Sequence, residues 1–218
     1  MSGALQAVYQ NLRSFGFPNG WPANIGDAFG GGYFAGQIDV SGTKYNLVVA
    51  DKTVGETTGK WGPYGVNTGV TSLIDGPTNT TTLSNLGVDY VAARFCENLN
   101  TGGFTDWYLP AFNELIVVYY YLKPSTTING TSYGSNANAV SPQPISTNYT
   151  TGNPAQTSAT NFRNGASSQE FALNSYWASR QYDNNNAWAI DFTEGGQGVN
   201  NKTGASSYGV RAIRRVLA

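Results

Sequence analysis

Alternating apolar and polar positions predict strands at both ends of the chain. Residues 33–38 and 44–50 are rich in aromatic and aliphatic side chains and flank a turn-forming segment, which predicts a hairpin over residues 27–51. Toward the C-terminus the pattern predicts three or four antiparallel strands joined by turns, at residues 175–179, 187–192, 198–202 and 208–216. In the second of these, every other residue from Trp188 to Phe192 is large and apolar, as expected of a strand with one buried face.

Helical periodicity is found in two segments in the middle of the chain. Over residues 88–99 apolar side chains recur at i, i+4 and i+8, which predicts a helix with Asp89 at its N-cap or in its first turn. Over residues 115–122 they recur at i, i+3, i+4 and i+7, and Pro110 suits the beginning of this second helix. The elements together predict an α+β fold.

Two long segments contain mainly small polar residues and predict loops. Residues 51–87 have little predicted regular structure, with Trp61 and Tyr64 as candidate anchors in the core. Residues 123–170 form a second long loop, in which a helical turn is predicted within residues 154–162. Charged residues make up only 11% of the chain and aromatic residues 13%, a composition typical of a loop-rich, folded domain rather than of a disordered chain.

The most distinctive motif is GGFTDWYLPAFNEL at residues 102–115, where a glycine turn leads into aromatic residues and then a helix. With YWAS, NAWAIDF and YGVRAIRRV nearer the C-terminus, it resembles the C-terminal domain family of collagen-like (Lcl-type) proteins over residues 25–217. The resemblance implies a C-type-lectin-like α+β domain, with two helices flanking short antiparallel sheets and long loops. It implies a binding domain of bacterial surface proteins or bacteriophage virions, and we expect Trp107 to be buried between both helices and the C-terminal strands.

The charge balance excludes several classes of partner. The chain has 12 basic and 13 acidic residues and a net charge of −1, so it has no electrostatic footprint for nucleic acid. Arg211, Arg214 and Arg215 form the one basic cluster, and alternation along a terminal strand explains it better than a phosphate site. No apolar run reaches the roughly 18 residues of a membrane span, and no classical signal peptide is recognisable.

The sequence offers no convincing catalytic or metal-binding constellation. Without histidine, neither a Ser-His-Asp triad nor a Cys-His pair can form, and Cys96 alone supports neither a disulfide nor a zinc site. We expect Cys96 to be a buried, inert thiol. A glycosidase would need two carboxylates, and the candidates, each with an ordinary structural role open to it, are Asp106, Glu114, Asp191 and Glu194. Asp106 is expected to cap turn backbone and Glu114 to lie in the first turn of a helix.

Binding is therefore assigned to polar loops near the C-terminus. Segments 182–186 and 195–202 contain Asn, Tyr, Gln and Gly beside aromatic strands, which is typical of binding loops. We expect the two loops to lie at one end of the C-terminal sheet and to expose a common set of ligand-binding residues: Tyr182, Asn184, Asn186, Gln197 and Asn200. The alternative is that both are plain hairpin turns. Residues 183–186 are also interpreted as a solvated turn rather than as a calcium site, and no metal or cofactor is expected.

Residues 1–24 differ from the rest and are predicted to form an N-terminal attachment arm, with the lectin-like domain over residues 25–218. The arm is apolar and interrupted by proline, so it either docks on a partner or packs on its own domain. Together with the family resemblance, the arm favours a non-enzymatic bacteriophage virion surface protein, a tail fibre, tail tip or head fibre. The arm would contact other virion proteins, and the domain would bind a host-surface glycan or protein.

Two other functions remain open. One is a structural capsid-decoration protein without a ligand, and the other is a bacterial cell-surface glycan-binding domain. A location on the outer surface of a virion and a homo-oligomer, by default a trimer, follow from the first interpretation, because fibres and spikes are symmetric assemblies.

Overall fold

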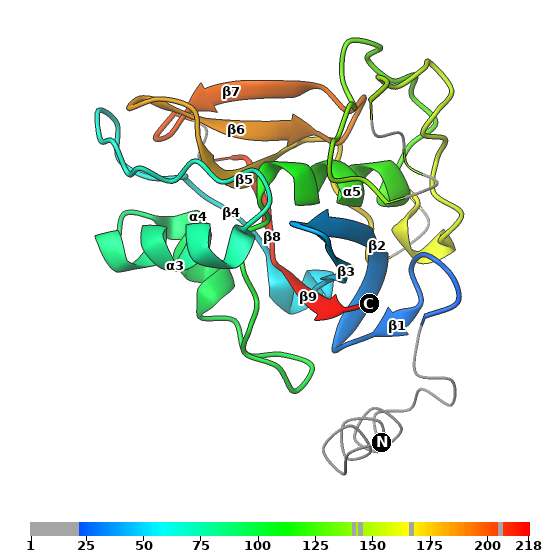
Figure 1. The fold of residues 1–218 in the computed structure, drawn as a ribbon, viewed down its shortest axis with the longest axis horizontal. Coiled ribbons are helices and arrows are strands. Elements are labelled where there is room, and N and C mark those ends of the chain that lie inside the picture. The colour runs from blue at the N-terminus through cyan, green and yellow to red at the C-terminus, as the bar shows by residue number, and fades with distance from the viewer. Residues whose placement is uncertain (1–21, 141–142, 144–145, 166–167, 205–206) are drawn as a thin grey trace.

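The protein is described by a computed structural model that covers residues 22–140, 143, 146–165, 168–204 and 207–218. The predicted attachment arm, residues 1–24, lies almost entirely outside the described residues. The rest forms a mixed α+β fold with two sheets, which confirms the predicted class (Figure 1).

The first sheet contains the predicted N-terminal hairpin. Its strands pair in the order β1-β2-β3-β9, with bounds Ala28–Phe29, Gly32–Val40, Thr43–Val49 and Ile213–Leu217. The hairpin β2–β3 turns through Ser41 and Gly42, which both have positive φ angles (53° and 87°), as a tight two-residue hairpin turn requires. The predicted hairpin is thus confirmed.

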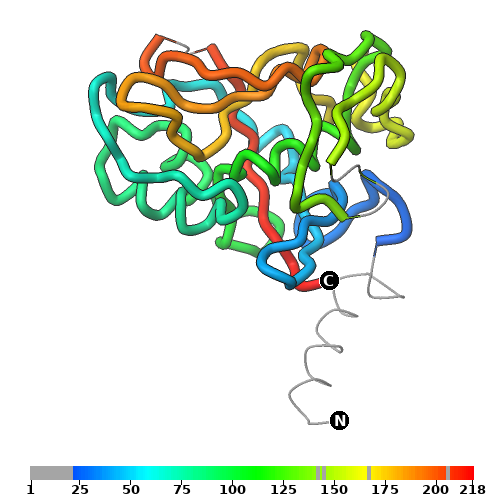
Figure 2. Tube along the Cα trace, turned by 45° about the horizontal axis from the view of Figure 1, so that its top comes forward, coloured from blue at the N-terminus to red at the C-terminus, as the bar shows by residue number. Residues whose placement is uncertain are grey.

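The second sheet contains the predicted C-terminal strands. Its order is β4-β8-β5-β6-β7, with bounds Glu56–Thr58, Gly209–Arg211, Ser175–Gln181, Asn186–Asp191 and Gln197–Asn201. The strand predicted at residues 208–216 is divided at Ala212 into β8 and β9, which belong to different sheets. The C-terminal chain therefore passes from one sheet to the other (Figure 2). The expectation of purely antiparallel pairing is wrong at one place, because β8 returns beside β5 in the parallel direction.

Both predicted helices are present, with shifted starts. Helix α4 (Val91–Glu97) begins after Tyr90, so Asp89 precedes the N-cap instead of capping the helix. Helix α5 (Phe112–Leu122) begins two residues beyond Pro110 and packs against both sheets. The helical turn expected within residues 154–162 is the 3-10 helix η1 (Thr160–Phe162).

The segment 51–87 was expected to be a loop, and this is wrong. It contains α2 (Lys52–Gly55), strand β4 and the three-turn helix α3 (Gly76–Leu86). The residues of α3 are mostly Thr, Asn and Ser, whose intrinsic helix propensity is low, so tertiary contacts hold it. The Asn79 amide donates to the Ser72 carbonyl (2.9 Å) and the Ser179 hydroxyl (3.0 Å).

Two apolar clusters make up the core of the described residues. The first surrounds α5 between the two sheets, and the second lies under α3 and α4. Trp107 is 2% exposed, as predicted, and it belongs to the second cluster, which contains residues of α4 and of the C-terminal strands but none of α5. Trp61 is buried and donates its indole N–H to the Ala178 carbonyl (2.8 Å), whereas Tyr64, also expected to be an anchor, is 58% exposed.

Cys96 is buried in the second cluster, as expected, and burial raises the pKa of its thiol. A raised pKa keeps the sulfur protonated and inert. Among the described residues, no helix is both long and apolar enough to cross a membrane.

Candidate functional site

The β5–β6 loop carries three of the predicted ligand-binding residues and is held by its own acid. The Asp183 carboxylate accepts hydrogen bonds from the backbone N–H groups of Asn185 and Asn186, both at 2.7 Å, and from the Asn186 amide at 3.1 Å. The hydrogen bond from the Asn186 side chain contributes most to the lowered pKa of Asp183. The Asp183 carboxylate therefore stabilises the conformation of the loop, as expected of a solvated turn.

A buried ammonium group fixes the base of the same loop. Lys202 is fully buried, and its Nζ donates to the carbonyls of Asn184 (2.9 Å) and Val66 (2.8 Å) and to Oε1 of Gln181 (2.9 Å). It also lies 5.0 Å from the centre of the Trp61 ring. Burial lowers the pKa of Lys202 to about 8, so the ammonium form prevails at neutral pH. Lys202 therefore ties the loop to the segment around residue 66.

The loop presents two exposed side chains above this base. Tyr182 is 56% exposed and packs edge-on against Trp188, with ring centres 5.4 Å apart. Asn184 is also exposed, whereas Asn186 is half-buried by its contacts with Asp183. The arrangement offers a rigid aromatic ring and an amide to a ligand.

The structure does not bring the five predicted binding residues together. Asn200 pairs with Ala187 and lies near the β5–β6 loop, but Gln197 pairs with Ile190 at the other end of the β6–β7 hairpin. Three residue steps along the strand separate these pairs, about 10 Å. The expectation that both loops lie at one end of the sheet is wrong, since consecutive hairpins of an antiparallel meander turn at opposite ends. Asn186 pairs with Asn201, so it and Asn200 point to opposite faces.

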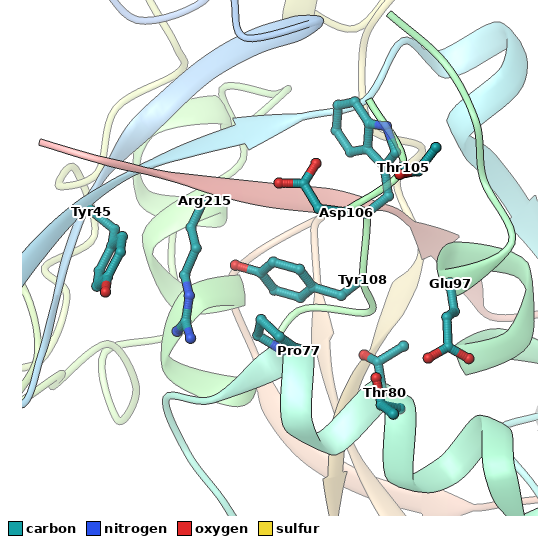
Figure 3. Close-up of a pocket in the computed structure, with 10 residues that line it drawn as sticks. Tyr45, Pro77, Thr80, Glu97, Thr105, Asp106, Tyr108 and Arg215 are labelled. Atoms are coloured by element: carbon teal, nitrogen blue, oxygen red, sulfur yellow. The ribbon is translucent and has the colours of Figure 1, made fainter. Parts of the chain in front are cut away.

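A second candidate site is a cavity of about 390 Å³ at the junction of α3, α4 and β9 (Figure 3). The sequence did not predict this site, although Asp106, Trp107 and Tyr108 of the GGFTDWYLPAFNEL segment, the central motif (residues 102–115), line it. Aromatic, hydroxyl and charged side chains from five separate segments line it, among them Tyr45, Thr80, Glu97, Asp106, Tyr108 and Arg215.

The basic cluster is fully paired around this cavity and between the sheets. Asp106 was expected to cap turn backbone; instead its carboxylate forms a two-bond fork with Arg214, at 2.7 and 2.8 Å. The interpretation of the arginines as strand residues rather than a phosphate site is supported, because each is paired with a carboxylate: Arg211 with Glu56, Arg214 with Asp106 and Arg215 with Asp75.

The other two candidate carboxylates, Asp191 and Glu194, lie at the β6–β7 turn, outside the cavity. Asp191 accepts a hydrogen bond from the Thr193 backbone (2.7 Å), which caps the β6–β7 turn, and Glu194 is exposed in that turn. Within the described parts of the chain, no three His, Cys, Asp or Glu side chains are grouped so that they could hold a metal ion.

The family profile of the Lcl C-terminal domain matches residues 66–214, which is more than half of the chain. The chain belongs to the Lcl C-terminal domain family. A search of curated proteins finds no match. The part that matches the Lcl C-terminal domain includes α3, α4, α5, the β5–β6 loop and Lys202. The hairpin β2–β3, and with it Tyr45 of the cavity, precedes the matched part.

Beside the cavity of this Lcl C-terminal domain lies a buried acid, Glu114. It lies in the first turn of α5, as predicted, and accepts hydrogen bonds from the Ala111 backbone (2.7 Å) and the Tyr108 hydroxyl (2.8 Å). Arg215 is 3.8 Å away. Burial outweighs these contacts and raises the pKa of Glu114 from 4.5 to about 7.

We expect Glu114 to make stability fall as the pH rises. The folded state binds a proton more tightly than the unfolded state, so the stabilisation is complete below pH 4.5 and is lost as the pH rises through about 7. The total change is on the order of 3 kcal/mol. Urea unfolding of the wild type and of Glu114→Gln at pH 5 and pH 8 measures it, because the glutamine can accept from the Ala111 N–H and donate to the Tyr108 hydroxyl oxygen but does not titrate. An equal pH dependence in both proteins would contradict the assignment.

Proposed function

We propose that this Lcl C-terminal domain protein is a bacteriophage virion surface protein, a tail fibre, tail tip or head fibre, and that its C-type-lectin-like domain binds a host-surface glycan or protein. The domain acts by binding, without catalysis, metal or cofactor. One observation carries the binding role: the β5–β6 loop exposes Tyr182 and Asn184 above a base that is already fixed by Lys202 and Asp183.

A fixed loop favours binding because its conformational entropy has been lost during folding and is not lost again when a ligand docks. Tyrosine and asparagine contribute contact area and adaptable hydrogen bonds. An amide can donate to one hydroxyl and accept from another, and an aromatic ring offers a flat face for stacking. Both groups suit a neutral, hydroxyl-rich ligand. Asn200 points to the opposite face of the sheet and Gln197 lies at the other end of the hairpin, so neither belongs to this surface.

The position on the virion is the second part of the proposal. Residues 1–24 attach the protein to other virion proteins, and the lectin-like domain faces outward as part of a homo-oligomer, a trimer by default. Mass spectrometry of purified particles, followed by antibody labelling in electron micrographs, tests this location. Detection of the protein only in the envelope of uninfected bacteria would favour the alternative of a cell-surface glycan-binding domain.

We expect the double substitution Tyr182→Ala and Asn184→Ala to abolish most host binding without unfolding the protein. Asn184 is exposed, so its substitution should change the free energy of unfolding by about 0.5 kcal/mol or less, and loss of the ring contact between Tyr182 and Trp188 should cost about 0.5–1.5 kcal/mol. Asn186 is left intact because its amide bonds to Asp183. Adsorption of particles carrying the variant, or binding of the purified domain to host cells, gives the measurement.

The matched control is Tyr64→Ala, which removes another exposed tyrosine outside the β5–β6 loop and should leave adsorption unchanged. Normal adsorption by the loop variant would refute the assignment of binding to this loop. If the loop is instead covered by another virion protein in the particle, the capsid-decoration alternative is favoured.

A further inference from the structure

The cavity between α3, α4 and β9 has the size and the fixed walls of a ligand site. Its volume of about 390 Å³ falls within the range usual for small-molecule pockets, about 300–1,000 Å³. It shares no lining residue with the β5–β6 loop. The Asp106 fork to Arg214 and the contact of the Thr80 hydroxyl with the Leu109 backbone hold its walls before any ligand binds.

Several polar side chains that line the cavity form no hydrogen bond to the described part of the protein. The Glu97 carboxylate and the hydroxyls of Thr81 and Thr105 contact no hydrogen-bond partner among the described residues. The Asp106 side chain is 56% exposed, so lone pairs beyond those used by Arg214 face solvent. Figure 3 shows Glu97 and Thr80 on one side of Tyr108, with Arg215 on the other.

The charges around the cavity select the class of ligand. Arg214 is neutralised by Asp106, and Arg215 by Asp75 at 3.1 Å while it also stacks over the Tyr45 ring at 4.9 Å. Glu97 therefore leaves one uncompensated negative charge. An acidic sugar would find no unpaired cation here and would be repelled by Glu97. Neutral hydroxyl groups can donate to the carboxylates and accept from threonine, and a sugar C–H face can pack beside the half-buried ring of Tyr45.

We propose that this cavity binds a neutral hexose unit, with Glu97 and Asp106 accepting hydrogen bonds from sugar hydroxyls and Thr105 adding a further bond. The inference rests on the proposed glycan-binding function and gives it a second site, with a preference for uncharged sugars. It assigns a role to polar groups at α4 and at the central motif that the packing of the core does not require.

Saturation-transfer NMR of the full chain with separate sugars tests the proposal. The probes are glucose, galactose, mannose and N-acetylglucosamine, with glucuronate as the charged comparison. At least one neutral sugar should receive saturation from the wild type, and glucuronate should receive none at the same concentration. Glu97→Ala should weaken binding by about tenfold or more, as expected when a hydrogen bond to a charged group is lost. Thr105→Val should weaken it less, and the control Glu194→Ala, at an exposed glutamate outside the cavity, should have no effect.

Thr105 is exposed, so its variant keeps the test valid even if Glu97→Ala fails to fold. The proposal is overturned if no neutral sugar binds, if glucuronate binds better, or if neither cavity variant weakens binding. It is also overturned if the Tyr182 and Asn184 substitutions alone remove sugar binding. Loss of host adsorption in that loop variant, without any sugar binding in the cavity, would leave the proposed function standing and reject only this site.

Discussion

Trp107→Ala is expected to lower the free energy of unfolding by about 3–5 kcal/mol, the usual result of truncating a buried aromatic side chain. Trp107 is 2% exposed in the cluster under α3 and α4. Its indole N–H lies 3.2 Å from the carbonyl oxygens of Thr101 and Phe104, so it also closes the turn that opens the central motif. Alanine would leave a cavity and remove the donor that these carbonyls share.

Urea unfolding at constant pH measures the effect of Trp107→Ala. Tyr64→Ala is the matched control, because it removes a large aromatic ring that is 58% exposed and should change stability by about 0.5 kcal/mol or less. If Trp107→Ala unfolds at the same urea concentration as the wild type, the central motif does not organise the second cluster.

The strand hairpins could be predicted because their information is local. In β6 the large side chains of Trp188 and Ile190 alternate with small ones, and in β2–β3 a turn separates two strand-like runs. Alternation cannot show where a strand changes sheet, however. Residues 208–216 keep a strand-like pattern through Ala212, and the division into β8 and β9 depends on pairing with distant strands.

Helix α3 was missed because its interior residues disfavour helices on their own. A start and a stop were nevertheless present: Asp75 caps the helix, Pro77 lies in its first turn, and Gly87 follows its end. These signals mark the two ends of the 11-residue helix, Gly76–Leu86, more clearly than its apolar periodicity does.

The candidate sites depend on contacts between residues far apart in the sequence. Arg214 reaches Asp106 across 108 residues, and Lys202 reaches Val66 across 136. The cavity likewise combines Tyr45, Glu97 and Arg215 from three separate elements. No spacing in the sequence indicates such contacts. By contrast, the exposure of Tyr182 and Asn184 follows from their position in a polar hairpin loop and was predictable.

The buried ion pair between Glu56 and Arg211 carries the second large expected effect. The two side chains lie on paired strands β4 and β8, with Nη1 and Oε2 2.7 Å apart. Arg211 is 1% exposed and also donates to the Ala50 carbonyl (2.9 Å) at the end of β3, so it joins the two sheets. Its Nη2 donates to Oε1 of Gln169 (3.1 Å), and its guanidinium lies over the Phe171 ring.

We expect Glu56→Ala to cost about 3–5 kcal/mol, because it removes the carboxylate that is hydrogen-bonded to a buried guanidinium. The matched control is Asp89→Ala, which breaks the Lys60–Asp89 pair, a contact of similar length (2.6 Å) between more exposed side chains. Solvent already screens that pair, so its loss should cost about 1 kcal/mol or less. Urea unfolding of both variants at neutral pH shows whether the loss of stability depends on the burial of the ion pair or only on its presence. Equal losses in the two variants would show that the Glu56–Arg211 pair stabilises the sheet junction no more than a surface contact does.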